Sequence, residues 1–151
     1  MASYRYLILL PLFFVLSCAQ IGTITGGMDD VVAPQPIMNK VEPKNESINF
    51  TAKEIKIPFN EFIKLKDVNK QLVVSPPMKS PPIISPQGTA SKEIKIEIID
   101  TLKPNTTYIF NFGNAVEDNN ERNVLENFKY VFSTGTYIDS LKTSGTIKDA
   151  I

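Results

Sequence analysis

Hydrophobic and polar residues alternate in several short runs along the chain from Pro36 onward. In the clearest run, at 92–98, Ile94, Ile96 and Ile98 share one side while charged residues occupy the other. Alternation with a period of two predicts a β-strand that is buried on one face. By the same criterion we expect strands at 37–41, 54–59, 71–75, 92–98, 106–112 and 128–134.

Aromatic residues share one side in each of the last two predicted strands. Their regular spacing predicts a core layer rather than a surface feature. A sugar-stacking platform is the alternative interpretation, and the absence of Trp weakens it. The rings concerned are Tyr108, Phe110, Phe112, Phe128, Tyr130 and Phe132.

Helical periodicity is nearly absent, since only 61–70 could form a turn or two of helix. The segment 76–86 holds five of the eleven prolines, and proline lacks the N–H donor that a central strand needs. We therefore expect this segment to be a loop or an edge strand. Repeated short strands separated by turns predict an all-β fold, an antiparallel β-sandwich or barrel.

The amino terminus has the pattern of a secretory leader. An unbroken run of ten apolar residues occupies 7–16, shortly after the single positive charge of Arg5. A membrane-spanning helix needs about 20 such residues, whereas a run of this length is typical of the hydrophobic region of a signal peptide. The sequence predicts a signal peptide over residues 1–17.

The residues that follow the apolar run are Val15-Leu16-Ser17-Cys18-Ala19. They resemble the bacterial lipoprotein box, although Leu16 is bulkier than the residue usually found there. The resemblance implies that Cys18 carries a lipid and that residues 18–33 are a flexible tether, which lacks apolar periodicity. It also implies outer-membrane attachment, because Ala19 is not the Asp associated with inner-membrane retention. The alternative is an ordinary signal peptide cleaved after Ser17 or Ala19.

Composition narrows the possible functions. The 151 residues are enough for about one domain, and 16 basic against 16 acidic residues give no net field for nucleic acid. The chain has no His and one Cys, which excludes Ser-His-Asp and Cys-His nucleophiles and the usual zinc sites. We predict no cofactor.

Hydrolysis by two carboxylates is the enzyme class that composition leaves open. Candidate pairs are Glu46 with Glu54 and Glu93 with Glu97. Nothing in the sequence would desolvate these groups or raise a pKa, so we predict no enzyme. The polar run at 118–121 offers oxygen ligands to Ca²⁺, but it lacks the spacing of a calcium loop. We interpret it as a polar turn between two strands and predict no metal site.

A family resemblance rests on the run from Leu102 to Tyr108, which has the form L-x-P-x-T-x-Y through Leu102, Pro104, Thr106 and Tyr108. In fibronectin type III and related Ig-like sandwiches, the Tyr hydroxyl of this motif bonds to the upstream backbone. Val116-Glu117-Asp118-Asn119 and Phe132-Ser133-Thr134-Gly135 extend the match. Residues 34–135 resemble the bacterial Ig-like domain first described in S-layer proteins.

The likeness is greatest to the version at the amino terminus of Bacteroidota lipoproteins, where a Thr-Gly-Gly-x-x-Asp tether follows the Cys. Here that tether is Thr25-Gly26-Gly27-Met28-Asp29-Asp30. The family usually has Gly after the Asp of the polar turn, where this chain has 120–123. We expect an Asn to adopt the positive φ there.

Residues 136–151 are expected to be a linker and the possible start of a truncated second β-domain, similar to the carboxypeptidase regulatory-like type; a polar tail is the alternative. The resemblance implies a lipid-anchored outer-membrane protein whose Ig-like domain acts as a non-enzymatic spacer or interaction module. The alternatives are a glycan- or protein-binding surface lipoprotein and a hydrolase. The expected partners are the membrane, through the lipid, and an unidentified protein or glycan.

Overall fold

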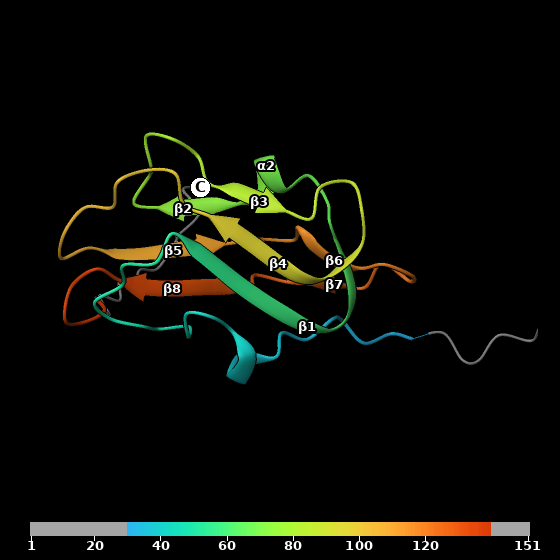
Figure 1. The fold of residues 1–151 in the computed structure, drawn as a ribbon. Coiled ribbons are helices and arrows are strands. Elements are labelled where there is room, and N and C mark those ends of the chain that lie inside the picture. The colour runs from blue at the N-terminus through green and yellow to red at the C-terminus, as the bar shows by residue number, and fades with distance from the viewer. Residues whose placement is uncertain (1–29, 140–151) are drawn as a thin grey trace, which may run out of the picture.

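Two antiparallel sheets packed face to face form the part of the chain described by the computed structural model, residues 30–139 (Figure 1). One sheet has the strand order β3 (Ile83–Ser85), β4 (Ser91–Glu97), β1 (Glu54–Leu65), β6 (Val116–Asp118) and β7 (Val124–Leu125). The other has the order β2 (Val73–Ser75), β5 (Thr107–Asn111) and β8 (Lys129–Ser133). The predicted all-β sandwich is confirmed.

The core lies between an isoleucine-rich sheet and an aromatic sheet. Alternate residues of β1 and β4 are fully buried, as are those of β5 and β8. Phe132 lies at the centre of the aromatic side, with four rings around it at centroid distances of 3.8 to 6.1 Å. These four rings belong to Phe50, Tyr108, Phe110 and Tyr130.

β3 and β8 are edge strands, one in each sheet. β3 is an edge strand within the proline-rich segment, which confirms the prediction for 76–86. The free edge of β8 is covered by residues 45–50, where Phe50 N–H donates to the Ser133 carbonyl at 2.9 Å. The Tyr130 hydroxyl holds the chain just before this segment by donating to the Pro43 carbonyl at 2.8 Å. Burial of this hydroxyl raises the pKa of Tyr130 to about 12.

The strand predicted at 37–41 is wrong. Two bridges, Pro36 to Phe59 and Glu42 to Lys56, flank this segment. Five residues therefore lie opposite only two residues of β1, and the excess chain coils into a 3-10 helix, η2 (Met38–Lys40). Only Val41 of this segment is buried.

β1 is longer than the predicted strand at 54–59. Its register with β4 shifts between Pro58 and Ile63, and beyond this bulge β1 also pairs with β6 along its other edge. Part of 61–70 is thus strand, and the helix expected there is the single turn α2 (Val68–Gln71). β6 and β7 form a hairpin around the polar residues 119–123, so a polar turn between two strands is confirmed.

The two ends of the described chain lie at opposite ends of the sandwich (Figure 1). At one end, which we call the proximal end, the Asn123 side chain donates to the Asp30 carbonyl beside the β6–β7 hairpin. At the other, the distal end, Asp139 N–H donates to Thr107 at the start of β5. The predicted leader, Cys18 and most of the 18–33 tether lie outside the described residues, as do residues 140–151 of the predicted C-terminal linker.

We expect Phe132→Ala to lower the free energy of unfolding by about 3–5 kcal/mol, because it opens a cavity among four packed rings. Phe62, which is 54% exposed, provides the control, and Phe62→Ala should cost less than about 1 kcal/mol. Urea unfolding followed by far-ultraviolet circular dichroism measures both values. Equal losses in the two variants would contradict the placement of Phe132 at the centre of the core.

Candidate functional site

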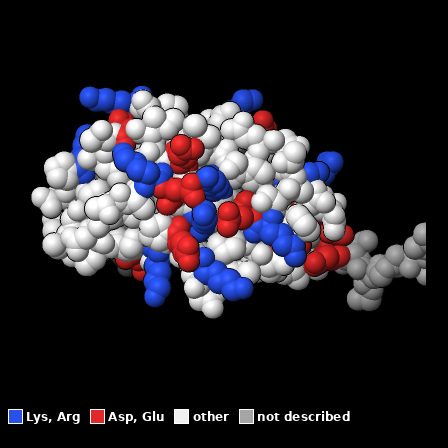
Figure 2. Space-filling model, viewed as in Figure 1, with Lys and Arg blue, Asp and Glu red and all other residues white. Residues whose placement is uncertain are grey.

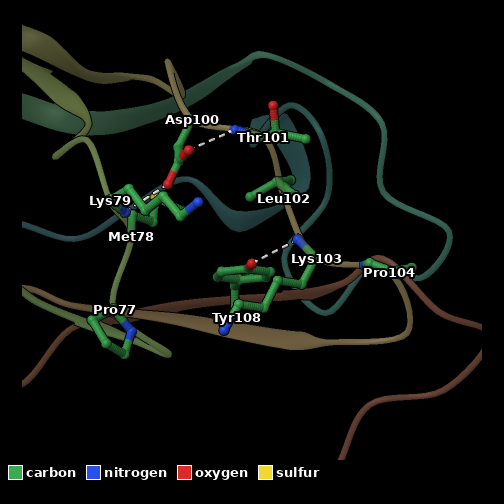
Figure 3. A pocket seen from close by; sticks show the side chains of 9 residues that line it. All are labelled: Pro77, Met78, Lys79, Asp100, Thr101, Leu102, Lys103, Pro104 and Tyr108. Atoms are coloured by element: carbon green, nitrogen blue, oxygen red, sulfur yellow. Dashed lines mark hydrogen bonds between the residues drawn. The ribbon is translucent and has the colours of Figure 1, made fainter.

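The motif from Leu102 to Tyr108 forms a corner at the distal end, where β5 begins. Tyr108 is 3% exposed, and its hydroxyl oxygen accepts the backbone N–H of Lys103 at 2.9 Å (Figure 3). Leu102 packs against the core. The Thr106 hydroxyl donates to the Pro104 carbonyl at 2.8 Å. Three motif side chains and the Pro104 carbonyl therefore act together to shape one loop.

A pocket of about 470 Å³ opens beside this corner (Figure 3). It lies where β4 has ended, β5 is about to begin and the chain has left β2. The sequence predicted the corner but not the pocket. The lining residues are Pro77, Met78, Lys79, Asp100, Thr101, Leu102, Lys103, Pro104 and Tyr108.

Asp100 joins the two segments that make the pocket wall. Its carboxylate accepts the backbone N–H of Lys79 at 2.6 Å and that of Thr101 at 2.8 Å. The bond from Lys79 is the main reason that the pKa of Asp100 lies below its usual value. The Lys53 ammonium also donates to the Asp100 carbonyl at 3.1 Å, so a basic side chain adjoins the pocket.

Asp118 organises the loop at the proximal end. This residue is 2% exposed, and its carboxylate accepts the backbone N–H groups of four consecutive residues, 120–123, at 2.7 to 3.0 Å. Burial alone would raise the pKa of Asp118, but these four bonds outweigh it and hold the pKa below its usual value. The loop is thus closed by its own carboxylate.

The expectation that an Asn adopts the positive φ in this loop is wrong. Arg122 has φ of 67°, and its N–H is one of those bound by Asp118. The carboxylate fixes the path of the loop, which compensates for placing a residue other than Gly in the left-handed region. Within residues 30–139, no three acidic side chains gather closely enough to hold a metal ion.

Charges of both signs are interleaved over the outer face of β1 and β4 (Figure 2). Glu54 pairs with Lys95 at 2.6 Å and with Lys56 at 3.2 Å. The bonds from Lys95 and then Lys56 hold the pKa of Glu54 below its usual value, whereas a catalytic acid needs a raised pKa. Glu97 lies directly opposite Glu54 in the same charged array.

The candidate carboxylates are not brought together in one cleft, since Glu46 and Glu54 line separate pockets. Glu93 lies on the same strand as Glu97, opposite Pro58 of β1. Glu46 is exposed and lies in the segment that covers β8, where its N–H donates to the Val131 carbonyl. Glu46 therefore lies beside the three-stranded sheet, whereas Glu54 belongs to the five-stranded one.

Phe62 is an exposed aromatic residue that the sequence pattern did not single out. It lies within the bulge of β1, between Pro58 and Ile63, and Lys92 Nζ lies 5.1 Å from the centre of its ring. The alternation of β1 continues from Ile55 to Ile63 and places Phe62 on the outer face. Within the described residues, no helix is both long enough and apolar enough to span a membrane.

Tyr108→Phe should lower the free energy of unfolding by about 1–2 kcal/mol, because the Lys103 N–H loses its acceptor. Tyr137, which is 63% exposed, is the matched control, and Tyr137→Phe should have almost no effect. Equilibrium urea unfolding compares the two variants with the wild type. A value near zero for Tyr108→Phe would mean that the corner contributes nothing to the fold.

Asp118→Asn should cost about 1–3 kcal/mol at neutral pH, because a charged acceptor of four N–H groups is lost. Since the folded pKa of Asp118 is lowered, its contribution is full above the unfolded value of about 4 and is lost as pH falls through the folded pKa. The difference between wild type and variant should therefore shrink in acid. Urea unfolding at pH 7 and at pH 3 measures it.

Asp67→Asn removes one negative charge from an exposed residue that makes no capping bond to α2. This control should change stability by less than about 0.5 kcal/mol. A loss that is the same for Asp118→Asn at both pH values would contradict the role of the ionised carboxylate.

Comparison with known proteins agrees with the sandwich and its corner. The family model described as a bacterial Ig-like domain matches residues 32–134, which is more than half of the chain. No curated protein matches the sequence. Domains of this family are typically non-catalytic and suggest an interaction or spacer module. The chain belongs to the bacterial Ig-like domain family.

Proposed function

We propose that this chain is a lipid-anchored protein of the outer membrane of a Gram-negative bacterium, as in Bacteroidota lipoproteins. In this proposal its Ig-like domain acts as a non-enzymatic spacer or interaction module. Support for the anchor comes from the lipoprotein box, in which the only Cys of the chain, Cys18, stands where the lipid would be attached. Several buried acyl chains together hold a protein firmly on a membrane.

The observation that carries the spacer role is the placement of the two chain ends. Asp30, twelve residues after Cys18, lies at the proximal end, and Asp139 lies at the distal end. β1 runs between these ends for twelve residues, at most roughly 40 Å at about 3.3 Å per residue. A domain that the chain enters at one end and leaves at the other adds its own length between the lipid anchor and the residues that follow Asp139.

The non-enzymatic part of the proposal rests on how the carboxylates are used. Asp100 and Asp118 bind backbone N–H groups, and Glu54 pairs with two lysines. Glycoside hydrolysis needs two carboxylates about 5–9.5 Å apart that face one cleft. Among residues 30–139, the candidate glutamates lie on an exposed strand face or on a covering loop.

Binding of a protein or glycan is a second candidate function, and two observations favour it. The distal pocket combines basic and apolar side chains. Phe62 exposes an aromatic ring beside Lys92 on the sheet surface. Both are features that recognition surfaces use, and neither is needed for a spacer.

The anchor is tested by intact mass and by detergent partitioning of the chain expressed in a Gram-negative host. The wild type should lose residues 1–17, gain a diacylglycerol on the Cys18 sulfur and an acyl chain on the freed Cys18 amino group, and enter the detergent phase, whereas Cys18→Ser should carry no lipid and should not enter it. Ser17→Ala keeps a small residue before Cys18 and should retain the lipid. An unmodified, water-soluble wild type would contradict the anchor and leave an ordinary secreted domain.

A further inference from the structure

We propose that the distal pocket binds an acidic peptide segment of a partner protein. A Glu or Asp carboxylate would lie between Lys79 and Lys103, and an apolar neighbour would lie against Met78 and Leu102. This inference deepens the interaction role proposed above and is independent of the lipid anchor.

The charge of the pocket favours a carboxylate ligand. Lys79 and Lys103 both line it, and Lys53 adjoins it through Asp100. The ion pairs found among residues 30–139 use other lysines, so the ammonium groups of Lys79 and Lys103 have no carboxylate within 4.0 Å in that range. Figure 3 shows the Lys79 side chain reaching toward Leu102.

Asp100 also lines the pocket and offsets part of this attraction, because its carboxylate is charged. Its two carboxylate oxygens are directed at the backbone N–H groups of Lys79 and Thr101, which they accept. The lining thus carries two ammonium groups, those of Lys79 and Lys103, against one carboxylate that already has its hydrogen-bond donors. An incoming carboxylate would be the group that pairs with the two lysines lining the pocket.

A hydroxyl group on the pocket wall offers a further donor. The Tyr108 oxygen accepts the Lys103 N–H, and the Tyr108 O–H has no acceptor among the described residues. Because Tyr108 is almost completely buried, a free O–H there gains from a ligand acceptor. Figure 3 shows this oxygen at the backbone N of Lys103, on the wall of the pocket.

The remaining wall favours a peptide over a sugar. Pro77, Met78, Leu102 and Pro104 supply apolar surface, which suits the side chain next to an acidic residue. A glycan site would need an exposed aromatic ring on which a sugar could stack, and the pocket has only the buried Tyr108. The volume of about 470 Å³ accommodates one or two side chains, not a folded surface.

Fluorescence anisotropy tests this with the full chain in mild detergent. The probe is a fluorescein-labelled peptide in which Leu and Glu alternate, flanked by Gly and Ser. It should bind the wild type, and the Lys79→Gln/Lys103→Gln double variant should bind it roughly tenfold more weakly. The matched peptide with Gln in place of Glu should not bind. Raising the salt concentration should weaken binding, because exposed charges are screened.

Lys40→Gln/Lys64→Gln removes the same charge from exposed residues outside the pocket and should bind like the wild type. Equal weakening by both double variants would overturn the proposal in favour of non-specific attraction. No binding of the Glu peptide, or equal binding of the Gln peptide, would also overturn it. So would binding of oligogalacturonate without binding of the peptide. Cys18→Ser should bind the peptide normally, which separates this site from the anchor.

Discussion

The packing of an aromatic sheet against an isoleucine-rich sheet is the interaction on which the rest of this structure depends. Residues 30–139 contain no Cys, so burial of apolar surface, rather than a disulfide, stabilises them. The register that buries the rings also places their polar atoms. Tyr108 and Tyr130 are both buried, yet each hydroxyl reaches backbone at the edge of the core. Core packing thereby fixes the distal corner and the segment that covers β8.

Alternation in the sequence predicted the strands whose side chains meet this core. It located β2, β4, β5 and β8 and excluded long helices, because a half-buried strand leaves a local pattern of period two. It failed where two facing segments of chain differ in their number of residues. The excess residues at 37–41 coil into η2, and the bulge of β1 shifts its register with β4. A local pattern carries no information about such counts.

The candidate sites also include features that the sequence predicts and features that it does not. The corner could be predicted because its four motif residues lie within seven positions of the sequence. The pocket could not, because Asp100 brings Lys79 to it from a segment recognisable only as proline-rich. The polar turn was predicted, but burial of Asp118 was not, since the groups that it binds are backbone N–H groups. For the same reason the positive φ of Arg122 was missed.

The carboxylates of Asp118 and Asp100 fix loops at opposite ends of the sandwich. They differ in whether charged side chains beside them remain without an ion-pair partner. Asp118 binds four consecutive N–H groups of its own loop, so this carboxylate is committed to holding the proximal end together. Asp100 instead joins two segments distant in sequence, and the lysines of those segments line the space between them. Since the chain arrives at the proximal end, that end suits attachment. The distal end suits recognition, because its fixed backbone carries lysines that make no ion pair among residues 30–139.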